Sequence, residues 1–106
     1  MLTGAFDLHV HAGPDVRARK MSALELARAA RQAGMRGLLL KNHHTATTAL
    51  ATTLREAIPG LQVFGGLALN RAAGGLNPYA VEAALAMGAA EIWMPFWSCA
   101  AEVRPD

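Results

Sequence analysis

The chain has 106 residues, of which 53% are hydrophobic and 17% charged, and its formal net charge at pH 7 is +2. This composition excludes a disordered chain and predicts one folded domain, residues 1–106. The small positive excess indicates neither nucleic acid nor a membrane surface as a partner. The single cysteine excludes an internal disulfide, and no segment resembles a signal peptide or a spanning helix, so we expect a cytoplasmic protein.

The first expected elements are a strand and a helix. Residues 5–11, "AFDLHVH", predict a strand with alternating faces. Asp7, His9 and His11 would lie on one face, and the other face would carry Phe6, Leu8 and Val10. A helix is expected to begin after Ser22, because the spacing of this serine and a glutamate at residue 25 is that of a capping box, and to end at Gly34.

The rest of the chain continues the alternation of apolar strands and alanine-rich helices. In the last helix Asn77 is expected as N-cap, Pro78 as the first helical residue and Gly88 as its end. The further segments are a strand at 37–43, a helix within 45–60 that Pro59 and Gly60 end, a strand at 61–67, a helix at 78–87 and a strand within 90–97 whose end Pro95 marks.

The spacing of the expected strands predicts the fold class. Their centres lie about 25–31 residues apart, which is the length of βαβ units. We therefore expect an α/β domain of four parallel strands alternating with three helices, either an open doubly wound sheet or part of a barrel. In such folds functional groups gather at the carboxyl ends of strands, and all four histidines lie there.

His9 and His11 are the strongest candidates for a metal site. Two residues apart on one strand, both imidazoles project from the same face, close enough to share one ion. Imidazole binds zinc, iron and similar ions well. The alternative is a pair of hydrogen-bonded histidines without a ligand. The strand end and the Gly-Pro turn that follows favour the metal site.

Two residues at the end of the second strand are further candidates for catalytic roles. His43 is expected to act as a third metal ligand or as a proton-transfer group, and Lys41 shares its face. A buried ammonium is costly unless it is paired. Lys41 would therefore pair with Asp7, bind an anionic substrate, or carry a carboxyl group that bridges two metals.

The loop "NRAAGGLNP", residues 70–78, is the candidate substrate-binding segment. Consecutive glycines let backbone amides turn toward an anion, and the dipole of the following helix favours negative charge. Asn70, Arg71 and Asn77 would supply side chains. An ordinary turn and helix cap is the alternative. The cations of "DVRARK", residues 15–20, would steer an acidic substrate or form a solvated face.

The motifs "DLHVHAGPD", "AGMRGLLLKNHH", "FGGLALN", "GGLNPYAVEAALAMGA" and "IWMP" together resemble a poorly characterised family within the amidohydrolase superfamily. The resemblance implies the N-terminal half of a (β/α)₈ barrel, with His9 and His11 as ligands of one or two divalent ions: zinc, with manganese or iron as alternatives. It also implies a metal-dependent hydrolase, in which an activated water attacks an amide, ester or related bond of a small molecule.

Other functions and partners stay open at this point. "AGMRGLLLKNHHTAT" is similar to the second-strand motif of polymerase-and-histidinol-phosphatase-like phosphoesterases, which would make His43 a metal ligand. A non-catalytic, self-associating α/β module is a second alternative. We expect a small-molecule substrate, anionic if the basic cluster steers it, and either a homo-oligomer or association with a missing C-terminal half.

Overall fold

The computed structural model describes residues 2–95. Its elements in chain order are β1 (Phe6–Val10), α1 (Ala23–Gln32), β2 (Gly37–Leu40), α2 (Thr48–Ala57), β3 (Gln62–Phe64), β4 (Gly66–Ala68), the 3₁₀ turn η1 (Arg71–Ala73), α3 (Pro78–Ala86) and β5 (Glu91–Trp93). Within this part of the chain no helix has the length and apolar character needed to cross a membrane. Residues 96–97 of the segment expected as the last strand, and Cys99, lie outside the described residues.

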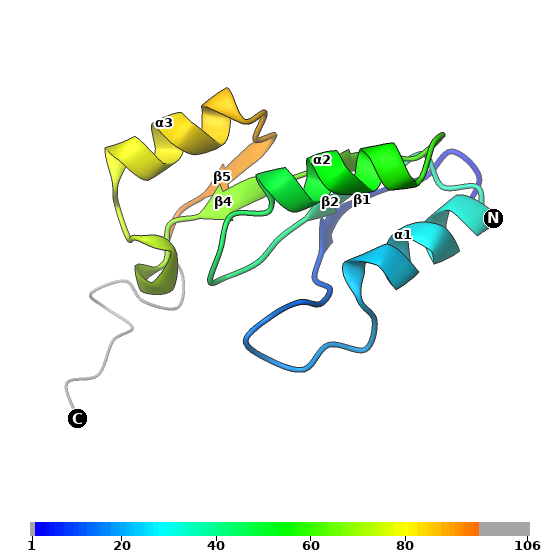
Figure 1. Ribbon diagram of the computed structural model, residues 1–106, viewed down its shortest axis with the longest axis horizontal. Helices are drawn as coiled ribbons and strands as arrows, with labels where there is room; N and C mark the ends of the chain where they lie inside the picture. The colour runs from blue at the N-terminus through cyan, green and yellow to red at the C-terminus, as the bar shows by residue number, and fades with distance from the viewer. Residues whose placement is uncertain (1, 96–106) are drawn as a thin grey trace.

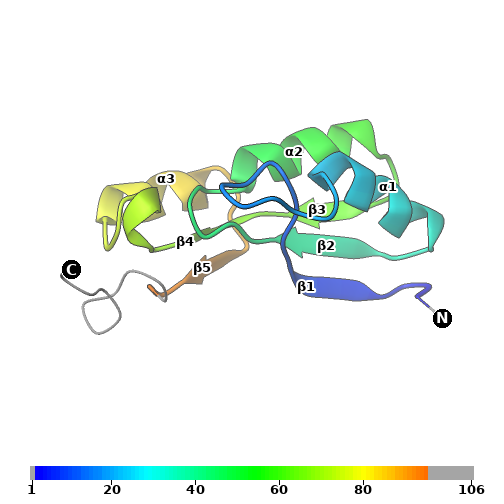
Figure 2. The ribbon, with the colours of Figure 1, turned by 90° about the horizontal axis from the view of Figure 1, so that it is seen from below.

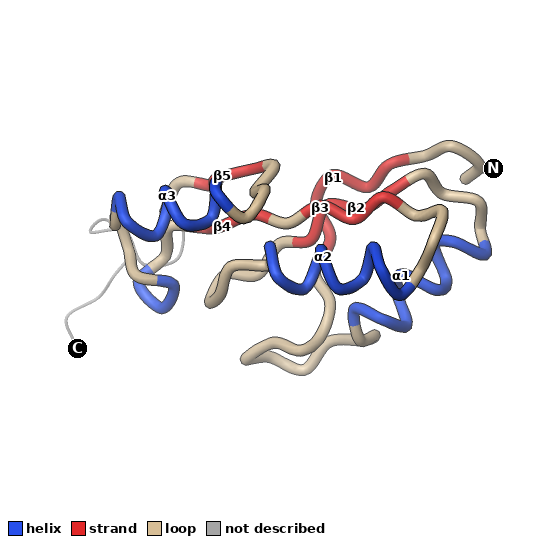
Figure 3. Tube along the Cα trace, turned by 45° about the horizontal axis from the view of Figure 1, so that its top comes forward, coloured by secondary structure: helices blue, strands red, loops and turns tan. Residues whose placement is uncertain are grey.

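The strands form two parallel sheets. One has the order β1-β2-β3, and the other pairs β4 with β5. Figures 1 and 3 show the two sheets end to end along the long axis of the molecule. The protein is thus a small α/β domain with three α-helices, and its described strands do not close into a barrel.

All three helices lie on the same side of the sheets, as Figure 2 shows. The main core lies between the first sheet and α1 with α2, where Leu38, Leu40 and Val63 meet buried alanines of the helices. A smaller core lies between α3 and the second sheet, around Leu67 and Ala84. One face of each sheet is therefore covered by helices, and the other carries no helix among the described residues.

The strand expected at 61–67 is divided into β3 and β4, so the prediction of four strands is not confirmed. Gly65 separates the two. Beyond it the backbone of Gly66 turns to Thr47: its N–H donates to Thr47 Oγ1 (2.9 Å), and its carbonyl accepts from the Thr47 N–H (3.0 Å). Because these groups no longer pair with β2, the ladder of the first sheet ends at β3.

The strand expected at 37–43 also ends earlier, at Leu40. The side chain of Asn42 explains this, because its Oδ1 accepts the backbone N–H groups of His44 (2.7 Å) and Thr45 (3.2 Å). An asparagine that bonds its own backbone two and three residues on forms a turn and stops a strand. Lys41 still continues the ladder, since its N–H donates to Val10 O (2.9 Å).

The regular alternation expected for residues 5–11 is broken. The register of β1 against β2 shifts between Asp7 and Val10. Phe6 and Leu8 line a cavity on the open face, whereas Val10 packs against the helix-covered core. The prediction that these three apolar residues share one face is therefore wrong for Val10, because an irregularity of this kind changes which way later side chains point.

The ends of α1 and α3 agree with the sequence analysis, whereas α2 is shorter than the segment expected as a helix at 45–60. Ser22 caps α1 in a complete capping box with Glu25, and Gly34 after the helix has a φ of 78°. Asn77 caps α3, with Pro78 as its first residue. These ends are confirmed because their signals are local to the chain.

Candidate metal and substrate site

The centre of the candidate site is the pair of histidines at the end of β1. The Nε2 atoms of His9 and His11 lie 3.1 Å apart, with ring centroids 5.0 Å apart. Two nitrogen ligands of one zinc ion, each about 2.0–2.1 Å from the metal, are separated by about 3.0–3.4 Å. Without an ion, one ring donates a hydrogen bond to the other at this distance.

The surroundings of the pair fit a divalent ion in part. The Nδ1 atom of His11 is buried and has no hydrogen-bond partner among residues 2–95. Among residues 2–95, no group of three or more histidine, cysteine, aspartate or glutamate side chains is placed to hold a metal. The pair can therefore supply two ligands, and the rest of a coordination shell would come from water, substrate or residues outside this part of the chain.

His43 lies directly beside this pair. Its ring is stacked on that of His11, with centroids 5.0 Å apart and planes inclined by 19°. Burial lowers the pKa of both rings, and positive neighbours add to this effect: Arg19 for His11 and Lys41 for His43. Because both shifts favour the uncharged imidazole, the lone pairs needed for binding a cation or accepting a proton are present at neutral pH.

Lys41 reaches the same place from β2. Its Nζ lies 4.8 Å from the ring centroid of Trp93, which is a cation–π distance, and the His9 ring is 6.4 Å from the same indole. Within the described part of the chain Lys41 makes no ion pair with Asp7, whose Oδ1 instead accepts the backbone N–H of His9 (3.1 Å). The pairing considered for Lys41 and Asp7 is therefore wrong.

The three predicted substrate-binding residues lie in different settings. Asn70 is only 3% exposed, and its Nδ2 lies 3.1 Å from His43 O and 3.3 Å from His43 Nδ1. Arg71 is exposed at the start of η1. Asn77 accepts the N–H of Tyr79 as the cap of α3, which is the alternative considered for it. Substrate contacts of all three stay predictions.

The glycine-rich loop has few amides left for an anion. The N–H groups of Ala73, Gly74, Gly75 and Asn77 all donate to carbonyls within residues 70–75. Gly74 and Gly75 have φ values of 112° and 66°, so their conformational freedom serves the turn itself. This arrangement favours an ordinary turn over a phosphate cradle.

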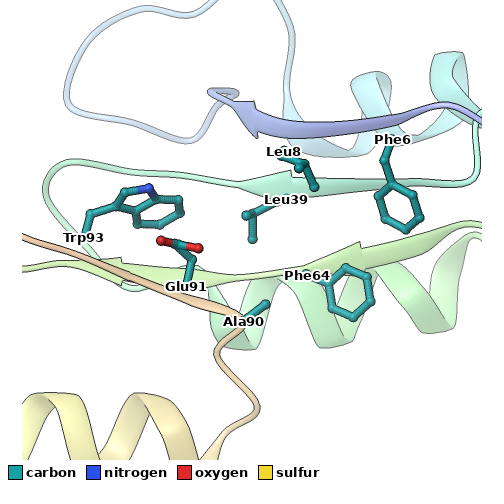
Figure 4. A pocket seen from close by; sticks show the side chains of 7 residues that line it. All are labelled: Phe6, Leu8, Leu39, Phe64, Ala90, Glu91 and Trp93. Atoms are coloured by element: carbon teal, nitrogen blue, oxygen red, sulfur yellow. The ribbon is translucent and has the colours of Figure 1, made fainter.

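An apolar cavity of about 580 Å³ lies on the open face of the sheets. Figure 4 shows the side chains that line it, with Trp93 at the end nearer the carboxyl ends of β1 and β2. The lining residues are Phe6, Leu8, Leu39, Phe64, Ala90, Glu91 and Trp93. Trp93 thus belongs to both the cavity and the cluster around His9, which joins an apolar surface to the candidate ligands.

A second polar cluster, around Asp15, was missed by the sequence analysis. The carboxylate is 1% exposed and accepts hydrogen bonds from Arg19 Nε (2.7 Å) and the Val16 N–H (2.7 Å). His44 Nδ1 lies 3.4 Å from its other side. The i, i+4 spacing of Asp15 and Arg19 was the only sequence signal, and outside a helix that spacing predicts no contact.

Comparisons with known proteins give one match. The model of a family described as "Family of unknown function (DUF6282)" matches residues 4–105. No curated protein and no solved structure matches the chain.

Proposed function

Because the chain belongs to the family of unknown function DUF6282, its activity has to be argued from its own residues, and we propose that it is the metal-binding part of a metal-dependent hydrolase. The observation that carries this proposal is the 3.1 Å separation of His9 Nε2 and His11 Nε2 at the carboxyl end of β1. That distance fits two nitrogen ligands of a single zinc ion, and imidazole also binds manganese and iron. A bound ion would lower the pKa of a water molecule to about 7 and so supply a nucleophile at neutral pH.

The side chains around the histidine pair suit a small substrate that carries an anionic group. Lys41 holds an ammonium beside Trp93, where it would attract a carboxylate or another anionic group of the substrate. The adjoining apolar cavity would hold the rest of the molecule and exclude water from it. These features support an amide or ester of a small acid as the substrate class, in line with the resemblance to amidohydrolases.

A phosphoesterase is the second candidate. His43 beside His11 favours it, because a histidine after the second strand is a metal ligand in the polymerase-and-histidinol-phosphatase-like enzymes that the segment resembles. The internal hydrogen bonds of the loop at 70–78 count against it, since they occupy amides that would face a phosphate. We therefore rank hydrolysis of an amide or ester first.

The open face of the sheets suggests how the fold is completed. Helices on one side and apolar side chains on the other are the arrangement of a barrel segment, whose bare face points to the barrel interior. We propose that a second copy covers this face. If the two copies are related by a two-fold axis parallel to the strands, β5 of each copy would lie beside β1 of the other and run parallel to it. The open edges of the sheets at β1 and β5 would then be paired.

The test is hydrolysis of three substrate panels, aryl esters, N-acyl amino acids and phosphomonoesters, by the chain loaded with zinc, manganese or iron. We expect turnover of an ester or amide that a chelator abolishes and that is lost in a His9→Ala/His11→Ala double variant. His44→Ala, in which the pair is intact, serves as the control. Hydrolysis that persists in the double variant or with chelator would overturn the proposal, and turnover of phosphomonoesters alone would favour the second candidate.

A further inference from the structure

The side chain of Asn70 contacts both the ring and the backbone carbonyl of His43. Asn70 follows β4 and is 3% exposed, so its amide has no bulk water to satisfy it. Its Nδ2 lies 3.1 Å from the carbonyl oxygen of His43 and 3.3 Å from Nδ1 of the same residue. One amide nitrogen thus faces two groups of a single histidine.

The carbonyl contact decides the orientation of the amide. A backbone carbonyl only accepts, so the atom beside it has to be the nitrogen of Asn70; the reversed amide would place two oxygens in contact. An amide nitrogen only donates, and its second hydrogen is available to Nδ1. The Nδ1 atom of His43 is therefore an acceptor, and in the neutral ring the proton is on Nε2.

We propose that Asn70 is a positioning residue that holds His43 as the Nε2–H tautomer, and that His43 acts as a hydrogen-bond donor to a substrate oxygen beside the metal pair. This role replaces the predicted one as a third metal ligand, because the Nδ1 lone pair is used by Asn70 and Nε2 is protonated. A neutral donor is suited to an oxygen on which negative charge develops, as in the attack on an amide or ester.

The donation of a hydrogen bond by His43 to a substrate oxygen rests on the proposed hydrolase function. The assignment of the Nε2–H tautomer does not. His43 is stacked on the ring of His11 at 5.0 Å, so a substrate group that reaches the pair also reaches His43. The two parts can therefore be tested by different measurements.

The first experiment is a long-range ¹H–¹⁵N correlation spectrum of the metal-free, ¹⁵N-labelled chain above the titration range of its histidines, with the His43 ring signals assigned from a His43→Gln variant. We expect the Nε2–H pattern for His43 and its reversal to Nδ1–H in Asn70→Asp, where a carboxylate accepts from Nδ1. Asn70→Ala serves as a second variant that removes the contact without adding an acceptor. An Nδ1–H pattern in the unaltered chain would overturn the inference.

The second experiment separates donation from metal binding. His43→Gln is expected to bind zinc with the same stoichiometry as the unaltered chain and to lose about 10²-fold in hydrolysis, the scale for removing one donor to an oxyanion. Loss of zinc in this variant would contradict the assigned role and restore His43 as a ligand. If the unaltered chain binds no zinc, the hydrolase proposal fails, and the tautomer spectrum still decides the role of Asn70.

Discussion

At the residue scale, Asp15 shows how a buried charge is held in this loop. Burial opposes its ionisation, but the hydrogen bonds from Arg19 and from the backbone of Val16 outweigh burial and lower its pKa. A carboxyl group whose pKa is lowered on folding stabilises the protein above the pKa of the unfolded chain, and this contribution is lost as the pH falls through the folded value. Asp15 therefore links the shape of the loop after β1 to the pH.

We predict that Asp15→Asn lowers the free energy of unfolding by about 1–3 kcal/mol at pH 7, because Arg19 Nε loses its charged acceptor in a buried setting. The deficit should begin to shrink as the pH falls below the usual carboxyl pKa and should vanish only below the lowered pKa of the folded state, where the unaltered side chain is also protonated. Urea unfolding from pH 3 to 7 measures this difference, with Asp7→Asn as the control. A deficit that is equal at both ends of the range would show that Asp15 acts by packing alone.

At the scale of elements, Thr47 joins the two sheets. It is 5% exposed, and its hydroxyl donates to Leu40 O at the end of β2 (2.8 Å) and accepts the N–H of Gly66 at the start of β4 (2.9 Å). Gly65 lies so close to this residue that a Cβ there would overlap the Thr47 carbonyl oxygen. The side chain of Thr47, which is distant in sequence, therefore determines where the strand expected at 61–67 divides into β3 and β4.

We predict that Thr47→Val lowers the free energy of unfolding by about 1–3 kcal/mol, because a buried carbonyl and a buried N–H both lose their partner. Thr53→Val is the matched control, because within the described part of the chain its hydroxyl bonds only Ala49 O, on an exposed part of α2. Its loss should cost no more than about 0.5 kcal/mol. Urea unfolding of the two variants compares them. Equal losses would mean that the hydroxyl of Thr47 does not join the sheets.

The same contacts show which features the sequence could predict. The capping box of Ser22 and Glu25 and the cap at Asn77 were predictable, because each depends on residues within three positions of one another. The end of the third strand at Gly65 was not, since Thr47 lies 18 positions earlier. The contact between the rings of His9 and His11 agrees with their spacing of two residues, although the register shift of β1 breaks the regular alternation from which it was predicted. The contact of Asn70 with His43 was not predictable, because the two residues lie 27 positions apart.

At the scale of the whole molecule, the bare face of the sheets is the feature that most needs a partner. Leu8 is 67% exposed on the edge strand β1, and it lines the cavity together with Phe6 and Trp93. Exposed apolar residues on an open strand edge are disfavoured in a monomer. The second copy proposed above would bury these residues and complete a barrel of parallel strands around them.

We predict that the chain sediments as a dimer of twice its 11.2 kDa mass and that Leu8→Lys converts it to a monomer. Tyr79→Lys is the control, because Tyr79 is 80% exposed on α3, away from the bare face, and its replacement should leave the mass unchanged. A monomer before substitution would contradict the two-copy arrangement. Dimers in both variants would place the contact elsewhere on the surface.

The central claim is that His9 and His11 hold one divalent ion. The most direct measurement is the zinc content of the purified chain after equilibration with zinc and removal of free metal, for the unaltered protein, the His9→Ala/His11→Ala variant and His44→Ala. The 3.1 Å separation of the two Nε2 atoms predicts close to one zinc per chain in the unaltered protein and in His44→Ala, and none in the double variant. Equal zinc in all three proteins, or none in the unaltered chain, would contradict the metal site and the hydrolase built on it.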